Sequence, residues 1–106
     1  MSATRVGVVG AGGRMGASVC EAIAADPLLA LVAAVDPQAA GQQRAGVAVA
    51  GELRALADAH AEVVVDFTVA HAARTTLPWL AMHGMHAVVG TTGFVADDFA
   101  AFHTAF

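Results

Sequence analysis

Glycines near the start of the sequence are the residues whose spacing points most directly to chemistry. An apolar run at residues 6–9 is followed by Gly10, Gly13 and Gly16, and a helix-forming stretch at residues 17–25 comes next. A strand, a glycine-rich turn and a helix in this order are typical of the start of a dinucleotide-binding βαβ unit. The spacing is G-x-x-G-x-x-G rather than the commoner G-x-G-x-x-G, because Met15 stands where that pattern has its third glycine.

Each of these three glycines has a different expected structural role. Gly10 allows the chain to turn sharply as it leaves the strand, and Gly13, without a Cβ, lets the backbone approach a pyrophosphate. Gly16 lets the helix pack closely on the strand. The N–H groups and the positive dipole end of the helix N-terminus then face the phosphates. Arg14 is the one basic residue that we assign to a ligand, as a partner of a phosphate.

An acidic residue lies at a fitting distance from the turn. Asp36 ends the apolar stretch 28–35 and comes twenty residues after Gly16. In a dinucleotide site, such a carboxylate accepts hydrogen bonds from the adenosine ribose hydroxyls. The alternative is that Asp36 and Pro37 simply open a turn. A ribose-binding Asp36 would repel a 2′-phosphate, which favours NADH over NADPH unless Arg44 folds back from the following loop.

Two later strands also end in unusual residues. The β-branched run 63–67 leads into Asp66, Phe67 and Thr68, and the run 86–89 leads into the sequence GTTGF at residues 90–94. Ligands of open α/β sheets bind beyond the carboxyl ends of the strands. The turn at 90–94 would suit a carboxamide-bearing ring such as nicotinamide, although an ordinary strand–helix loop would look the same. Asp66 could act as an acid, but orienting the backbone at the strand end is the favoured role.

The elements that must position these residues alternate along the chain. Apolar patterns predict strands at residues 5–9, 30–35, 46–50, 63–67 and 86–89, with a loop at 36–44. They predict helices at 13–25, 52–59, 71–82 and 96–106, with Gly84 as a C-terminal cap. This alternation predicts a single α/β domain over residues 1–106, a Rossmann-like doubly wound parallel sheet.

Composition excludes several other classes of protein. The 106 residues are 58% hydrophobic and 13% charged, with a net charge of −4, five arginines and no lysine. No basic patch for nucleic acid or anionic lipid is present, and no stretch has the pattern of a membrane span or a signal peptide. A cytoplasmic location follows. Cys20 fits a small buried hydrophobe, and the five histidines lack the spacing of metal ligands.

Three motifs in order resemble one enzyme family. The sequences VVGAGGRMG at residues 8–16, VDFT at 65–68 and VVGTTGF at 88–94 are similar to the N-terminal half of dihydrodipicolinate reductase, also called 4-hydroxy-tetrahydrodipicolinate reductase. The resemblance implies a lysine-biosynthetic oxidoreductase that transfers a hydride from NADH or NADPH to a cyclic dicarboxylate. It implies cofactor contacts from the glycine loop, from Asp36 and from the later strand ends. These residues are Gly10, Ala11, Gly12, Gly13, Arg14, Met15, Gly16, Asp36, Phe67, Thr68, Gly90, Thr91 and Thr92.

The family's substrate half has a His-His motif, a catalytic lysine and a Ser-Gly-Thr stretch that this sequence lacks. We therefore expect no catalytic residue among these 106 residues and no turnover by the chain alone. Phe99, Phe102 and Phe106 in the last helix would then expose apolar surface and favour self-association. The alternative function is a stand-alone nucleotide-sensing or CoA-binding module, against which the GTTGF turn argues.

Overall fold

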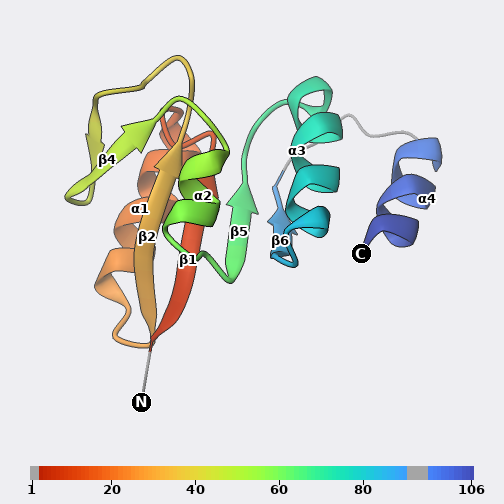
Figure 1. The fold of residues 1–106 in the computed structure, drawn as a ribbon. Helices are drawn as coiled ribbons and strands as arrows, with labels where there is room; N and C mark the ends of the chain where they lie inside the picture. The colour runs from red at the N-terminus through yellow and green to blue at the C-terminus, as the bar shows by residue number, and fades with distance from the viewer. Residues whose placement is uncertain (1–2, 91–95) are drawn as a thin grey trace.

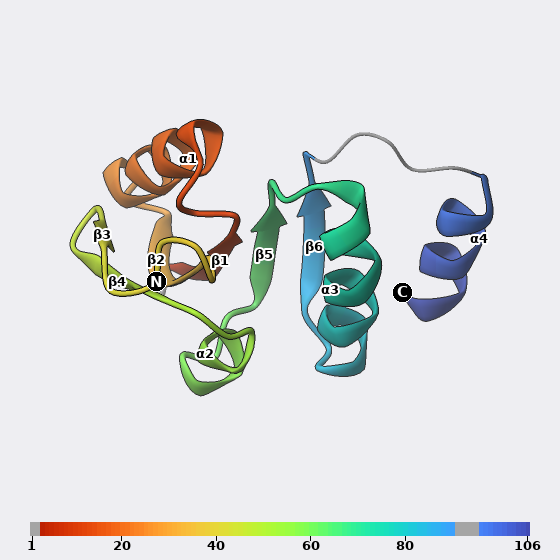
Figure 2. The ribbon, with the colours of Figure 1, turned by 90° about the horizontal axis from the view of Figure 1, so that it is seen from above.

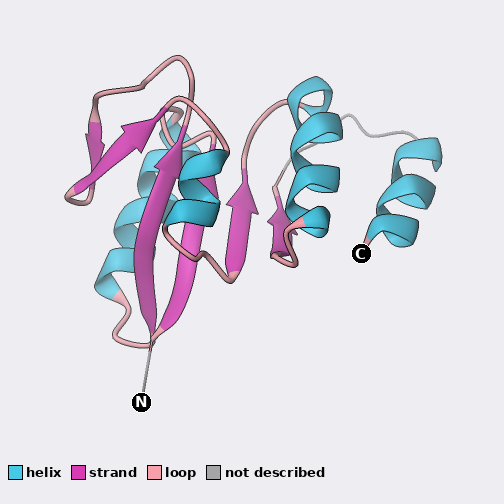
Figure 3. Cartoon of the chain, in the orientation of Figure 1, coloured by secondary structure: helices cyan, strands magenta, loops and turns pink. Residues whose placement is uncertain are grey.

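A computed structural model describes residues 3–90 and 96–106 of the chain as strands and helices in alternation (Figure 1, Figure 3). The strands are β1 (Thr4–Val9), β2 (Leu29–Val35), β3 (Gln43–Arg44), β4 (Val47–Ala50), β5 (Val63–Asp66) and β6 (His86–Val89). The helices are α1 (Arg14–Ala25), α2 (Arg54–Asp58), α3 (Ala70–Met82) and α4 (Ala96–Ala105). The predicted elements therefore recur with ends within two residues of those expected.

The sheet has the doubly wound arrangement that the alternation predicted. Its strands lie in the order β3-β4-β2-β1-β5-β6, and every neighbouring pair except β3–β4 is parallel. The chain begins in the middle with β1, builds outward through β2 and β4, and then returns to place β5 on the other side of β1. The order of winding reverses at β1, and the carboxyl end of such a strand is where an open α/β sheet forms its ligand crevice.

One part of the prediction was wrong. Residues 36–44 were expected to form a loop, but Gln43 and Arg44 form β3, which pairs antiparallel with β4. The two residues between the paired Arg44 and Val47 both have positive φ, 51° at Ala45 and 83° at Gly46. This is the backbone of a two-residue hairpin turn of the primed type. Ala45 stands where such a turn usually has Asn or Asp, so the local residue pattern does not indicate a hairpin.

Helices cover both faces of the sheet, with α1 and α2 on opposite sides (Figure 2). Val6 and Val8 of β1 pack with Cys20 and Ile23 of α1, whereas Val9 packs in the other cluster with Leu56 of α2. Gly7 is required there, because a Cβ at Gly7 would lie 2.4 Å from Leu56 Cδ2. The predicted burial of Cys20 is confirmed, since its side chain is fully buried.

Gly84 ends α3 as predicted. Its φ is +70°, the Gly84 N–H donates to the Ala81 carbonyl at 3.1 Å, and the Met85 N–H donates to the Leu80 carbonyl at 3.0 Å. These two bonds form a Schellman motif, which satisfies carbonyls that the helix end leaves open. The chain is thereby turned directly into β6.

The β6–α4 end of the molecule is thinly covered. β6 forms one edge of the sheet, and α4 has no buried residue, although Phe102 packs against the core cluster of α2 and α3. The expected apolar surface on the last helix is present at Phe99, which is 61% exposed, and at Phe106, which is 52% exposed, whereas Phe102 is half-buried. Within residues 3–90 and 96–106, no helix has the length and apolar character needed to cross a lipid bilayer.

Candidate functional site

The glycine turn between β1 and α1 is tightly built. Gly10 has a φ of +84°, and its N–H donates to the Val35 carbonyl at 2.8 Å. A Cβ on Gly10 would lie 3.0 Å from the carbonyl carbon of Phe67 and 3.2 Å from the Thr68 nitrogen. The turn therefore needs glycine both for its backbone conformation and for its closeness to the end of β5.

Gly16 and Gly13 differ in what surrounds them. A Cβ on Gly16 would lie 2.1 Å from the Gly10 carbonyl oxygen, so α1 can approach the turn only with glycine there. A Cβ on Gly13 would meet nothing closer than that same oxygen, at 3.6 Å. Gly16 thus serves packing inside the protein. At Gly13 the protein has room for a Cβ, so internal packing does not explain the glycine, as expected of a residue that lets a ligand approach the backbone.

The start of α1 has the features of an anion site. Gly13 is the N-cap and offers no side-chain cap, and α1 carries no acidic residue in its first turn. Arg14 and Met15 are exposed at this end of the helix. The first N–H groups and the positive end of the helix dipole therefore lie beside one arginine. The first turn of α1 has no carboxylate.

Asp36 is held against the glycine turn by backbone N–H groups. Its Oδ2 accepts a hydrogen bond from the Gly12 N–H at 3.0 Å, and its Oδ1 accepts one from the Gln38 N–H at 3.0 Å. A Cβ on Gly12 would lie 2.6 Å from Asp36 Oδ2 and 2.5 Å from the Ala39 Cβ. Gly12 is thus a residue that lets the end of β2 close on the turn, a role that its place in the motif did not indicate.

The bond to Gln38 also means that Asp36 opens a turn, as the alternative interpretation held. The two roles are compatible, because each carboxylate oxygen accepts one backbone bond and has lone-pair capacity left. Asp36 is half-buried, and its carboxylate is fixed in place beside the turn. A fixed carboxylate at this position is what a ribose-binding residue requires.

Arg44 reaches the same turn from the hairpin. Its Nε donates to the Ala11 carbonyl at 2.9 Å, and its Nη2 lies 3.4 Å from the Gly12 carbonyl oxygen. Sequence reasoning assigned only Arg14 to a ligand and mentioned Arg44 as a loop residue that could fold back. The hairpin at Ala45 and Gly46 is what brings it there. Burial raises the pKa of the Cys20 thiol in α1, and the Arg44 charge offsets part of that rise.

The ends of β5 and β6 meet beside the turn. A Cβ on Gly90 would lie 2.2 Å from Phe67 Cε1, so the Phe67 ring occupies the space that glycine leaves. Asp66 is fully buried, and its Oδ1 accepts hydrogen bonds from the Thr68 N–H at 2.8 Å and from the Thr68 hydroxyl at 2.6 Å. These bonds support the backbone-orienting role of Asp66. Thr91 and Thr92 lie outside the described residues.

The described residues of the predicted site therefore lie together at the carboxyl ends of the strands. Gly10 contacts both parts of this site, the end of β2 and the end of β5. Asp36 and Gly12 lie on the β2 side of the turn, and Phe67, Thr68 and Gly90 lie on the β5–β6 side. In the described part of the chain, no group of three or more His, Cys, Asp or Glu residues is placed to hold a metal ion.

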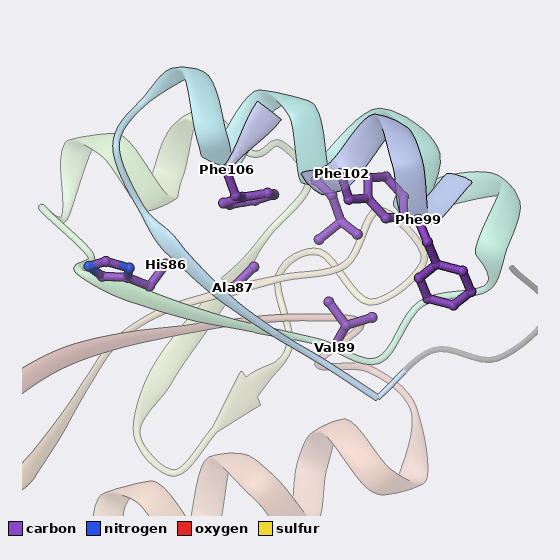
Figure 4. A pocket seen from close by; sticks show the side chains of 7 residues that line it. His86, Ala87, Val89, Phe99, Phe102 and Phe106 are labelled. Atoms are coloured by element: carbon purple, nitrogen blue, oxygen red, sulfur yellow. The ribbon is translucent and has the colours of Figure 1, made fainter. Parts of the chain in front are cut away.

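An apolar groove of about 440 Å³ lies elsewhere, between α3, β6 and α4 (Figure 4). Its lining is mostly apolar and includes no residue of the glycine turn. The lining residues are Leu77, His86, Ala87, Val89, Phe99, Phe102 and Phe106. The groove and the glycine turn are separate features: Arg14 and Asp36 lie beside the turn, whereas the described lining of the groove has His86 as its polar side chain.

Comparison with known proteins identifies the family. The family model described as the N-terminus of dihydrodipicolinate reductase matches residues 4–105. The 4-hydroxy-tetrahydrodipicolinate reductase of Nocardia farcinica is 44% identical over 92 residues, which are 87% of this chain and 32% of the relative. The chain thus spans about a third of the length of that curated relative.

Solved structures share the fold. Dipicolinate-bound dihydrodipicolinate reductase from Paenisporosarcina sp. TG-14 superposes with a TM-score of 0.83 at 21% identity, over 98% of this chain and 43% of that one. GenD2 from gentamicin A biosynthesis, solved in complex with NAD, superposes with a TM-score of 0.72 at 28% identity, over 99% of this chain and 33% of that one. The family match, which extends over nearly the whole chain, shows that this protein belongs to the dihydrodipicolinate reductase N-terminal domain family.

Proposed function

We propose that this chain is the NAD(P)H-binding domain of a 4-hydroxy-tetrahydrodipicolinate reductase. The observation that carries the proposal is the glycine turn, in which internal packing does not require glycine at Gly13, before a helix N-terminus that has no side-chain cap. An anionic pyrophosphate fits this place because N–H donors, the helix dipole and Arg14 all favour negative charge there. Family membership and the NAD complex of GenD2 point to the same class of ligand.

In this proposal, different residues bind different parts of the dinucleotide. The N–H groups of the first turn of α1 hold the pyrophosphate, with Arg14 as the side-chain cation. The Asp36 carboxylate would accept hydrogen bonds from the hydroxyls of the adenosine ribose. It would use the lone pairs that are not engaged by the N–H groups of Gly12 and Gln38. Because the Asp36 carboxylate would repel a 2′-phosphate, NADH is the favoured cofactor.

The nicotinamide end would lie where β5 and β6 end. Phe67 and Gly90 are in close apposition there, Thr68 is fixed by Asp66, and Thr91 and Thr92 follow in the sequence. Nicotinamide, when bound, supplies the hydride for the reduction. The residues of this chain would orient the nicotinamide ring. Orientation matters because the hydride acceptor must lie about 3–3.5 Å from the reacting carbon of the ring.

Turnover of a cyclic dicarboxylate would need cations close to the nicotinamide end. Arg14 and Arg44 lie at the phosphate and ribose end, and Arg74 is paired with Asp98 on α4. We therefore propose that the groups holding the substrate carboxylates belong to the part of the longer relatives that this chain does not match. The 106 residues alone then bind cofactor and do not catalyse the reduction.

The test is a fluorescence titration of NADH against the purified chain and its Gly13→Val variant. A Val side chain at Gly13 places carbon where the pyrophosphate should lie, so we expect the Kd to rise more than tenfold, or roughly 1.4 kcal/mol. Ala24→Val is the control, because it adds the same branched side chain at an exposed position near the other end of α1. A folded Gly13→Val chain with unchanged NADH affinity would contradict the proposal.

A further inference from the structure

Met15 carries an exposed thioether at the start of α1. It is the second residue of the helix, and its side chain is 60% exposed, whereas the buried residues of α1 are Gly16, Cys20 and Ile23. Its N–H is among the first four of the helix, which have no partner within the helix. Packing of α1 on the sheet therefore does not account for Met15, and its side chain is open to small solutes beside the proposed pyrophosphate site.

The other methionines provide a comparison within the same chain. Met82 is 82% exposed and Met85 is 6% exposed, and Met1 lies outside the described residues. Met82 ends α3 shortly before β6 begins, so it lies at the amino ends of the parallel strands, opposite the glycine turn (Figure 1). Of these two accessible side chains, Met15 is the one beside the proposed dinucleotide site.

We propose that Met15 is an oxidation-sensitive residue of the dinucleotide site, and that its conversion to methionine sulfoxide weakens dinucleotide binding. The inference rests on the proposed function, because it concerns the pyrophosphate end of the same site. In the oxidation step, hydrogen peroxide transfers one oxygen atom to the Met15 sulfur. An S–O bond forms, the O–O bond of the peroxide breaks, the sulfur loses two electrons, and the second oxygen leaves as water.

The effect on binding follows from the polarity of the product. A thioether is apolar, whereas a sulfoxide has a strong dipole whose negative end is its oxygen, a hydrogen-bond acceptor. At the start of α1 that oxygen would compete with the pyrophosphate for N–H donors, and its partial negative charge would repel the phosphate oxygens. A bound pyrophosphate would in turn cover Met15, so binding and oxidation should oppose each other.

The first experiment measures oxidation residue by residue. The purified chain is treated with hydrogen peroxide, with and without NAD⁺, and peptide mass mapping follows the sulfoxide at Met15 and at Met82. NAD⁺ is used because peroxide oxidises NADH. At a NAD⁺ concentration about ten times its Kd, about a tenth of the chain is free, so we expect oxidation of Met15 to slow by about fivefold or more, with Met82 unchanged. Equal rates at Met15 with and without bound NAD⁺ would overturn its place in the site.

The second experiment measures binding after oxidation. Calorimetric titration with NAD⁺ should give a Kd about fivefold or more higher for the peroxide-treated chain than for the untreated chain. Reduction of the treated chain by methionine sulfoxide reductases A and B should restore the Kd. Met82→Leu should keep this sensitivity to peroxide. In Met15→Leu, peroxide treatment should leave the Kd as it was before treatment.

The outcomes separate this inference from the function on which it rests. An unchanged Kd in a chain whose Met15 is fully oxidised would overturn the inference and leave the dinucleotide site intact. The same conclusion would follow if peroxide treatment weakened binding by Met15→Leu as much as binding by the unaltered chain. Absence of NAD⁺ binding by the untreated, unaltered chain would overturn the proposed function itself.

Discussion

The pKa and the accessibility of the Cys20 thiol report how closely α1 packs against the sheet. Its thiol is fully buried, and burial raises its pKa above the ordinary value of 9.0. A thiol with a raised pKa in the folded state ionises first in the unfolded chain, so its contribution to stability is complete below about pH 9.0 and is lost as pH rises. The sequence has no Lys and no Tyr, so Cys20 is the main group that titrates in this range.

We therefore expect the free energy of unfolding to fall as the pH rises above about 9.0, and Cys20→Ala to flatten that slope. Urea denaturation at a series of pH values measures it. Iodoacetamide should label Cys20 slowly in the native chain and rapidly in urea. Rapid labelling without denaturant, or an equal slope in Cys20→Ala, would show that the thiol is not buried as described.

Single residues also show how far sequence reasoning reached. The roles of Gly10 and Gly16 followed from the motif, because a sharp turn and close helix packing are properties that only glycine supplies. The contact of Gly12 with Asp36 did not follow, since it depends on where β2 ends relative to the turn. The contacts of Arg44 with the glycine turn did not follow from the motif either. They depend on the register of the β3–β4 hairpin rather than on the neighbours of Arg44 in sequence.

The α3–α4 pair is fastened by one ion pair. Arg74 Nε lies 2.9 Å from Asp98 Oδ1, and its Nη2 donates to Oδ2 at 3.0 Å, a two-point contact across the helices. Asp97 and Asp98 lie in the first turn of α4, where carboxylates favour the helix dipole. Asp98 has this second role as well, and its hydrogen bond raises the pKa of Arg74.

Because α4 has no buried residue, loss of this pair should loosen α4 more than the sheet. We expect Asp98→Asn to speed amide hydrogen exchange in residues 96–106 by about threefold or more, with the strands unchanged. Asp97→Asn changes the same charge in the same helical turn and serves as the control. Equal exchange in the two variants would mean that the Arg74 contact does not hold α4.

At the scale of elements, the prediction was strongest where periodicity and capping agreed. The parallel strands and α1 followed from apolar runs and glycines, and Gly84 marked the end of α3. β3 was missed because it is two residues long and its turn has Ala45 where Asn or Asp is usual. The pairing of β5 with β1 across the middle of the sheet follows from the doubly wound class rather than from any local signal.

For the molecule as a whole, apolar surface gathers at the β6–α4 end. Val89 is 40% exposed on the edge strand and lines the apolar groove together with Phe99 and Phe106, which are exposed on α4. An open strand edge beside an apolar patch favours association between copies. We predict that the chain self-associates through this end as its concentration rises.

Sedimentation velocity over a concentration series tests this prediction. Phe99→Gln should lower the weight-average mass at high concentration toward that of a monomer. Leu28→Gln is the matched control, because Leu28 is 65% exposed and precedes β2, outside the groove and the edge strand β6. A monomeric unaltered chain at every concentration, or equal effects of the two substitutions, would refute association through this surface.

If a dinucleotide binds at the glycine turn and not in the apolar groove, titration of NADH into the ¹⁵N-labelled chain, followed by amide chemical shifts, will distinguish the two because they involve different residues. We expect the largest shift changes at residues 10–16, 36–38 and 67–68, with the groove unaffected. Changes centred on Phe99, Phe102 and Phe106, or none at saturating NADH, would show that the dinucleotide does not bind at the turn.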